Sequence, residues 1–177
     1  HFGFEFVGIQ PFLHPWIKPE LMGEQPLTLA LMVVNLNGGT GFGSRRLHMT
    51  DMDRAAASLV LESHRLQPPW TDFFGQRMPK MKFVRGKEVH GIQGAEFVDV
   101  PLNWRQAKNM ADVLRRDGFR FSSVLPGFGR TESGEPYDLL RMYRPPRALV
   151  DSNAFKLIHI IPELEALKRF CEDELTS

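Results

Sequence analysis

A nine-residue pattern occurs twice in this chain and constrains its fold more than any other feature. Residues 3–11 and 118–126 share glycine, two phenylalanines, a β-branched residue and proline at identical offsets. Each copy predicts a turn on glycine followed by a strand that the proline stops. A polar loop, a Gly-Glu pair and an apolar run ending near Met32 or Met142 follow the two copies. The sequence therefore predicts two copies of one strand–loop–strand unit.

Composition and charge narrow the class of protein. The 177 residues, 24% charged and 42% hydrophobic, suit one ordinary soluble domain or two small ones. A net charge of +1 gives no long-range attraction to nucleic acid or to an anionic membrane, so neither partner is expected. No apolar run approaches the ~20 residues that a membrane-spanning helix needs. Because the chain begins without methionine, directly in a strand pattern, we expect it to be a piece of a longer protein.

The cysteine and histidine residues argue against metal and disulfide chemistry. The single cysteine, Cys171, can form neither a disulfide framework nor a cysteine zinc site, and it fits a cytoplasmic location. The histidines lack the spacing of paired metal ligands, so no metal site is expected. Cys171 lies on the apolar face of a helix pattern, which predicts a core residue rather than a nucleophile.

Periodicity and cap residues predict an alternation of strands and helices. Residues 27–36 are apolar nearly throughout, which predicts a strand covered on both faces. Asn103 precedes a helical pattern as its N-cap, and Gly118 follows it as the residue that stops the helix. The expected strands are 2–7, 27–36, 95–102, 119–125 and 138–144, with a weak hairpin over 81–90, and the expected helices are 53–66 (capped by Thr50 or Asp51), 104–117 and 162–175.

A glycine-rich segment, residues 37–46, has two readings. Glycines such as Gly41 and Gly43 let backbone N–H groups converge on an anion, and Arg45 and Arg46 supply charge, as in a phosphate cradle. The other reading is a linker between two structural units. Three residues intervene before the next predicted helix, whereas a cradle opens directly into a helix, and this favours the linker.

The succession of strand, Asn103, helix, Gly118-Phe119 turn, strand, loop and strand resembles the C-terminal half of the GNAT acyltransferase fold. The resemblance covers about a third of the chain, from residue 95 to residue 143. It implies an α+β fold with a mixed, mostly antiparallel sheet flanked by helices. With the repeat, it also implies that residues 1–46 hold the closing hairpin of a first GNAT-like unit plus a linker, and residues 47–177 a second unit. In a rival arrangement, 27–36 is the central strand and the glycine segment the pyrophosphate loop of one unit.

The resemblance implies an N-acyltransferase that uses acetyl-CoA or another acyl-CoA and a small-molecule or peptide amine. Asn103 matches the acyl-CoA-contacting asparagine of the family, although helix capping explains it as well. The proton-donating tyrosine expected four residues before the Gly-Phe glycine is replaced by Leu114.

Three other side chains are candidates for acid–base work: Glu88, His90 and Tyr137. Because the acid is missing at Leu114, the alternative is a catalytically degenerate GNAT-like module that binds a ligand or protein partner. A third alternative is a structural domain with the proline-rich loop 14–19 as its contact surface. The first strand–loop–strand unit has no helix of its own, so its apolar surface must be covered by another element. A second copy of the chain or the remainder of a longer chain would supply it.

Overall fold

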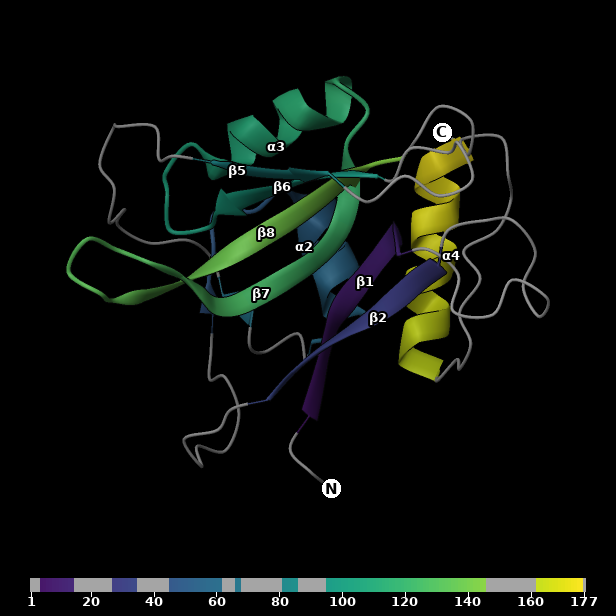
Figure 1. Ribbon diagram of the computed structural model, residues 1–177, viewed down its shortest axis with the longest axis horizontal. Coiled ribbons are helices and arrows are strands. Elements are labelled where there is room, and N and C mark those ends of the chain that lie inside the picture. The colour runs from purple at the N-terminus through teal and green to yellow at the C-terminus, as the bar shows by residue number, and fades with distance from the viewer. Residues whose placement is uncertain are drawn as a thin grey trace.

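The computed structural model describes residues 4–14, 27–34, 45–61, 66–67, 81–85, 95–145 and 162–176 (Figure 1). Its strands are β1 (Phe4–His14), β2 (Leu27–Val34), β3 (Arg45–Arg46), β4 (Leu66–Gln67), β5 (Lys82–Arg85), β6 (Glu96–Pro101), β7 (Arg120–Arg130) and β8 (Pro136–Arg144). Its helices are α2 (Asp51–Ser58), α3 (Ala107–Arg116) and α4 (Pro162–Thr176).

The described strands form one six-stranded antiparallel sheet in the order β2-β1-β7-β8-β6-β5, with a parallel pair, β3 and β4, beside it. Helices α2, α3 and α4 flank the sheet (Figure 1). The predicted α+β class, with a mostly antiparallel sheet flanked by helices, is confirmed. Strands from both halves of the sequence share this one sheet, because β1 lies next to β7.

The two copies of the sequence pattern form hairpins with the same register. Each residue of β1 corresponds to the residue of β7 that lies 115 positions later, and each residue of β2 to the residue of β8 that lies 110 positions later. With these offsets, six registered pairs of β1 with β2 match registered pairs of β7 with β8. Phe6 opposite Met32 thereby corresponds to Phe121 opposite Met142. Both interruptions of the register recur as well, the first of them after Phe6 and after Phe121. Such interruptions mark β-bulges, so even the irregularities of the hairpin are duplicated.

The two hairpins meet at equivalent positions. Gly8 of β1 is opposite Ser123 of β7, and these two residues are themselves counterparts in the repeat. Because β1 and β7 run antiparallel, a half-turn about this crossing exchanges one hairpin with the other. Gly8 has a φ of +152°, and a Cβ built on it would lie 2.3 Å from the Cβ of Ser123. Only glycine allows the two strands to approach this closely.

The structure corrects the expectation that proline ends each strand. Strand β1 continues past Pro11 to His14, and β7 continues past Pro126 to Arg130. In both strands the proline falls inside the second interruption of the register. Proline has no N–H to donate to a ladder, so it is accommodated at a bulge instead of terminating the strand.

The prediction that the second strand is covered on both faces is wrong. Ala30 is exposed and Met32 has an exposed fraction of 42%, because among the described strands β2 lies at the edge of the sheet. Helix α2 ends at Ser58, and Leu66 lies in β4, so the predicted helix 53–66 is too long. Its predicted cap is confirmed, since the Thr50 hydroxyl accepts the Asp53 N–H at 3.0 Å.

The turn between α3 and β7 is as predicted. Gly118 follows the C-cap with a φ of +86°, in the left-handed region. Its N–H donates to the Arg115 carbonyl, and the Phe119 N–H donates to the Leu114 carbonyl, both at 2.9 Å. These two bonds make a Schellman motif, in which glycine at C′ satisfies the last carbonyls of a helix. Phe119 and Leu114 are both buried, which supplies the accompanying hydrophobic contact.

A single core joins sheet and helices. The largest fully buried side chains are Trp104, Tyr143, Phe97, Phe121, Ile9, Leu102, Leu125, Leu140 and Met142. Cys171 of α4 belongs to this core, as predicted, and burial raises the pKa of its thiol well above the usual value. A protonated, fully buried thiol is no nucleophile.

Candidate functional site

Three segments meet at Leu102, the residue that follows β6. The Leu102 N–H donates to the Asp138 carbonyl of β8, and the Leu102 carbonyl accepts the His48 N–H, both at 2.9 Å. Asn103, predicted from the sequence as an acyl-CoA contact, comes next in the chain. Tyr137 precedes Asp138, and β3 with Arg45 and Arg46 ends two residues before His48. These predicted site residues come from distant parts of the sequence, and in the structure they lie on adjoining segments.

Asn103 does not cap α3. The helix begins after Gln106, which makes no side-chain cap bond, so the predicted start at residue 104 and the capping role of Asn103 are wrong. Tight turns fill the interval, where the Trp104 N–H donates to the Pro101 carbonyl at 3.3 Å and the Ala107 N–H to the Trp104 carbonyl at 2.9 Å. The Asn103 side chain therefore has no helix-capping role, which was the structural alternative to ligand binding.

Three polar side-chain atoms around this turn are buried and have no hydrogen-bond partner among the residues that the structure describes. They are Asn103 Oδ1, Trp104 Nε1 and His48 Nε2. The Trp104 side chain has an exposed fraction of only 2%. A buried polar group without a partner costs about 1–3 kcal/mol, so such groups are rare in folded proteins. An amide oxygen, an obligatory donor and an imidazole nitrogen are each atoms that the amide groups of a ligand can pair with.

Tyr137 lies beside this turn on β8, with its ring against Gly129 of β7. A Cβ built on Gly129 would lie 2.0 Å from the ring, so glycine makes room for it. Burial raises the pKa of the Tyr137 phenol above its ordinary value. The phenol therefore keeps its proton at neutral pH, as a general acid must. In contrast, Leu114, at the position where the resemblance led us to look for a proton donor, is a core residue.

The remaining predicted residues divide into two groups. Gly41, Gly43, Glu88 and His90, with residues 15–19 of the proline-rich loop, lie outside the described residues. The backbone of Arg45 and Arg46 is described and pairs in parallel with Leu66–Gln67. The link between β3 and the Leu102 junction is the bond from the His48 N–H, two residues after β3, to the Leu102 carbonyl.

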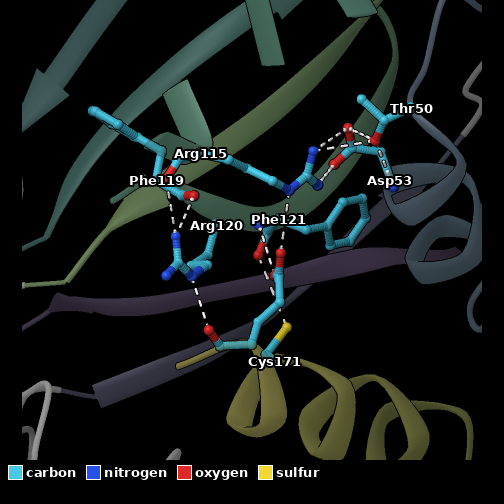
Figure 2. Close-up of polar contacts among 8 residues, drawn as sticks. Thr50, Asp53, Arg115, Phe119, Arg120, Phe121 and Cys171 are labelled. Atoms are coloured by element: carbon cyan, nitrogen blue, oxygen red, sulfur yellow. Dashed lines mark hydrogen bonds and ion pairs between the residues drawn. The ribbon is translucent and has the colours of Figure 1, made fainter. Parts of the chain in front are cut away.

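Sequence reasoning missed a buried ionic network that links α2, α3 and α4 (Figure 2). Arg115 donates to both carboxylate oxygens of Asp53, to the Thr50 hydroxyl at 3.1 Å and to Glu174 at 3.4 Å. Helical periodicity alone places Arg115 on the polar, solvent-facing side of α3, yet its side chain has an exposed fraction of only 15%. The spacing of Thr50 and Asp53 is that of a capping box, a local signal of this site, but nothing local indicates Arg115.

The network fixes α4 to the start of β7. Glu174 accepts the Phe121 N–H at 3.2 Å, and Arg120 donates to the Glu174 carbonyl at 2.9 Å. Burial raises the pKa of Glu174 above 4.5, and it outweighs the attraction of Arg115, which acts in the opposite direction. Burial also opposes the charge of Arg115, but its bonds to Asp53 and Glu174 raise its pKa overall. Every polar group named here is used within the protein, so the network is structural.

Two ion pairs connect β6 with β8 in the same way. Arg141 donates to both oxygens of Asp99 at 2.7 and 2.8 Å, and Arg144 pairs with Glu96. Among the described residues, no group of three histidine, cysteine or acidic side chains is placed to hold a metal ion. None of the described helices is long and apolar enough to cross a membrane.

Comparison with protein families, with curated proteins and with solved structures found no match to this chain.

Proposed function

We propose that this chain is an acyl-CoA-binding domain of the GNAT type, and that it transfers an acyl group to a small-molecule or peptide amine. The observation that carries the proposal is the set of unpartnered buried atoms around Asn103, at the position where the sequence resembles the acyl-CoA-contacting asparagine of that superfamily. Amides of an acyl-CoA arm supply both partners that these atoms need: an N–H for Asn103 Oδ1 and a carbonyl for Trp104 Nε1. A cytoplasmic location, where acyl-CoA is available, belongs to the same proposal.

Two other features support acyl transfer. Strand β3, with Arg45 and Arg46, ends two residues before the His48 N–H that donates to Leu102, and it offers charge for the phosphates of the donor. Tyr137 is a protonated phenol on the adjoining strand and would supply the proton for the departing thiolate. Glu88 or His90 would serve as the base for the amine, as the sequence suggests.

One observation favours a second candidate, a module that binds acyl-CoA or a related ligand without catalysis. Leu114 stands at the family's acid position and is buried in the core, so α3 itself offers no proton donor. In this case the Asn103 turn binds the ligand, and Tyr137 packs against Gly129 without acting as an acid.

Titration of acetyl-CoA, followed by thermal unfolding and by release of free thiol in the presence of amines, tests both candidates. A saturating ligand at about 100 times its dissociation constant stabilises the fold by about 2.7 kcal/mol, which is a clear rise in Tm. Asn103→Ala should abolish that rise without lowering the Tm of the free protein, because it removes an unpartnered buried atom. A helix cap would instead lose about 1 kcal/mol on the same substitution.

Tyr137→Phe separates the enzyme from the module. It should leave the acetyl-CoA-dependent rise in Tm unchanged and, if Tyr137 is the acid, lower thiol release about 100-fold or more. If the unmodified protein binds acetyl-CoA but releases no thiol, the non-catalytic binding module is the correct candidate. Absence of any rise with short acyl-CoA molecules rejects both candidates.

A further inference from the structure

The duplicated hairpin shows what the outer edge of β2 lacks. On β8, the edge that faces away from β7 carries β6, through six registered pairs from Glu96 to Pro101. The equivalent edge of β2 has no neighbour among the described strands (Figure 1). The two hairpins otherwise share register and bulges. The half-turn that relates them therefore predicts a strand on β2 at the place of β6.

Burial at equivalent positions agrees with this asymmetry. Leu140 and Met142 of β8 have no exposed surface, whereas their counterparts Ala30 and Met32 are exposed. Met32 and Met142 are the same residue type, so the 42% exposure of Met32 reflects missing cover rather than a different side chain. The segment that follows β6 in the chain is α3, which packs against β6. A strand followed by a helix would bury both the edge and this face of β2.

The two outer strands of the described sheet also differ in how well they are protected against pairing with other chains. At the other end of the described sheet, β5 has only four residues and begins and ends with a cation, Lys82 and Arg85. Short length and charge are the usual means by which an edge strand avoids pairing with other chains. Strand β2 has eight residues and contains no charged residue. Its sequence is that of a strand with a neighbour on each side.

We infer that the outer edge of β2, with Ala30 and Met32, is a docking surface for a strand–helix segment of another polypeptide that is similar to β6 and α3. The segment pairs antiparallel with β2, and its residues at the places of Val98 and Val100 lie opposite Met32 and Ala30. Its sequence differs from β6 in one respect. Asp99 and Glu96 of β6 are opposite Arg141 and Arg144, whereas the corresponding residues of β2 are apolar.

The apolar residues of β2 that correspond to Arg141 and Arg144 are Leu31 and Val34, which lie 110 positions earlier in the chain. The docking segment therefore carries uncharged residues at both places, because Leu31 and Val34 offer no cation. At the place of Asp99, which is only 8% exposed, a carboxylate would also be buried without a partner. The inference rests on the repeat and does not require acyl-CoA binding, so failure of one proposal leaves the other intact.

A synthetic peptide with the sequence of residues 95–117 and the substitutions Glu96→Thr and Asp99→Thr is the probe. Hydrogen exchange of residues 27–34 is measured in the whole chain with and without it. Peptide at about 100 times its dissociation constant should slow this exchange about 100-fold, with no such change in 136–144. The peptide with Glu96 and Asp99 retained is the matched control and should bind at least tenfold more weakly.

Two substitutions of exposed methionines complete the test. Met32→Lys should weaken peptide binding at least tenfold, because docking would bury a charge without a partner. Met52→Lys, at a methionine of α2 with 47% exposure, should leave binding unchanged. Lack of protection by the probe, or equal protection in Met32→Lys, would overturn the inference. A dimeric chain whose residues 27–34 are already protected would overturn it too, by assigning the edge to a second copy.

Discussion

Replacing Gly8 by alanine perturbs the point at which the two hairpins join. The described pairing between β1 and β7 consists of Gly8 opposite Ser123. A Cβ at Gly8 would lie 2.3 Å from the Ser122 carbonyl oxygen and 2.5 Å from Ser123 Cα. These are backbone atoms, so no rotation of a side chain relieves the clash, and the strands must separate. The φ of +152° adds a second penalty for any residue with a Cβ.

The expected loss follows from these two penalties. Overpacking in a well-packed interior costs about 1–3 kcal/mol, and a backbone conformation reserved for glycine costs about 1–3 kcal/mol when another residue adopts it. Gly8→Ala should therefore lower the free energy of unfolding by about 2–6 kcal/mol. A domain of this kind has about 5–15 kcal/mol in total, so the loss is a large fraction of its stability.

Urea unfolding followed by circular dichroism measures the effect. With an m-value of about 2 kcal/mol/M, the midpoint should fall by about 1–3 M. Gly134→Ala is the matched control, because Gly134 also has a positive φ, +87°, but a Cβ there meets nothing within 4 Å. Gly134→Ala isolates the backbone penalty, about 1–3 kcal/mol. If the two variants lose equal stability, close approach at the crossing is not what requires glycine, and the reasoning fails.

Three further predictions concern contacts within the sheet and the ionic network. Gly129→Ala should cost about 1–3 kcal/mol by displacing the Tyr137 ring, and the cost should disappear in a Tyr137→Ala background; an unchanged cost would exclude the ring as its cause. Because burial raises the pKa of Glu174 in the folded state, its contribution to stability is present below pH 4.5 and is lost as the pH rises through the raised value. Glu174→Gln should remove that slope from urea midpoints measured between about pH 4 and 7, and an identical slope would contradict the assignment. Arg115→Met leaves the fully buried carboxylate of α2 unpaired and should cost about 3–5 kcal/mol, whereas Arg116→Met, at an exposed position of the same helix, should cost less than about 0.5 kcal/mol.

Local signals in the sequence correctly predicted turns, helix caps and core residues, but they did not predict which elements lie next to one another. The Gly118 turn, the Thr50 cap and the burial of Cys171 each depend on residues a few positions apart, and all three are confirmed. The exposure of Met32 depends on which strand lies beside β2, and an apolar run alone does not encode that. The ion pair of Arg115 with Asp53 joins residues 62 positions apart, so helical periodicity assigned the arginine to solvent.

The candidate site shows the same division. Asn103 was recognised from its place between a strand and a helical pattern, but its two roles could be separated only by the three-dimensional start of α3 at Ala107. Trp104 and His48 were not predicted, because a core tryptophan and a lone histidine carry no spacing signal. Their polar atoms became informative only when the fold showed them buried without partners.

The repeat connects the candidate site with the docking surface. Leu102 is held in place because its N–H donates to the Asp138 carbonyl, and the counterpart of Asp138 on β2 is Thr28. A strand–helix segment docked on β2 in the register of β6 therefore places its own equivalent of Leu102 against the Thr28 carbonyl. The residue after it then occupies the position that Asn103 occupies in this chain. Docking would thus create a second turn of the same geometry, related to the first by the half-turn at Gly8. Ligand binding at that turn requires the docked segment to carry its own equivalents of Asn103 and Trp104, so the ligand stoichiometry of the complex reports on the segment's sequence as well as on its docking.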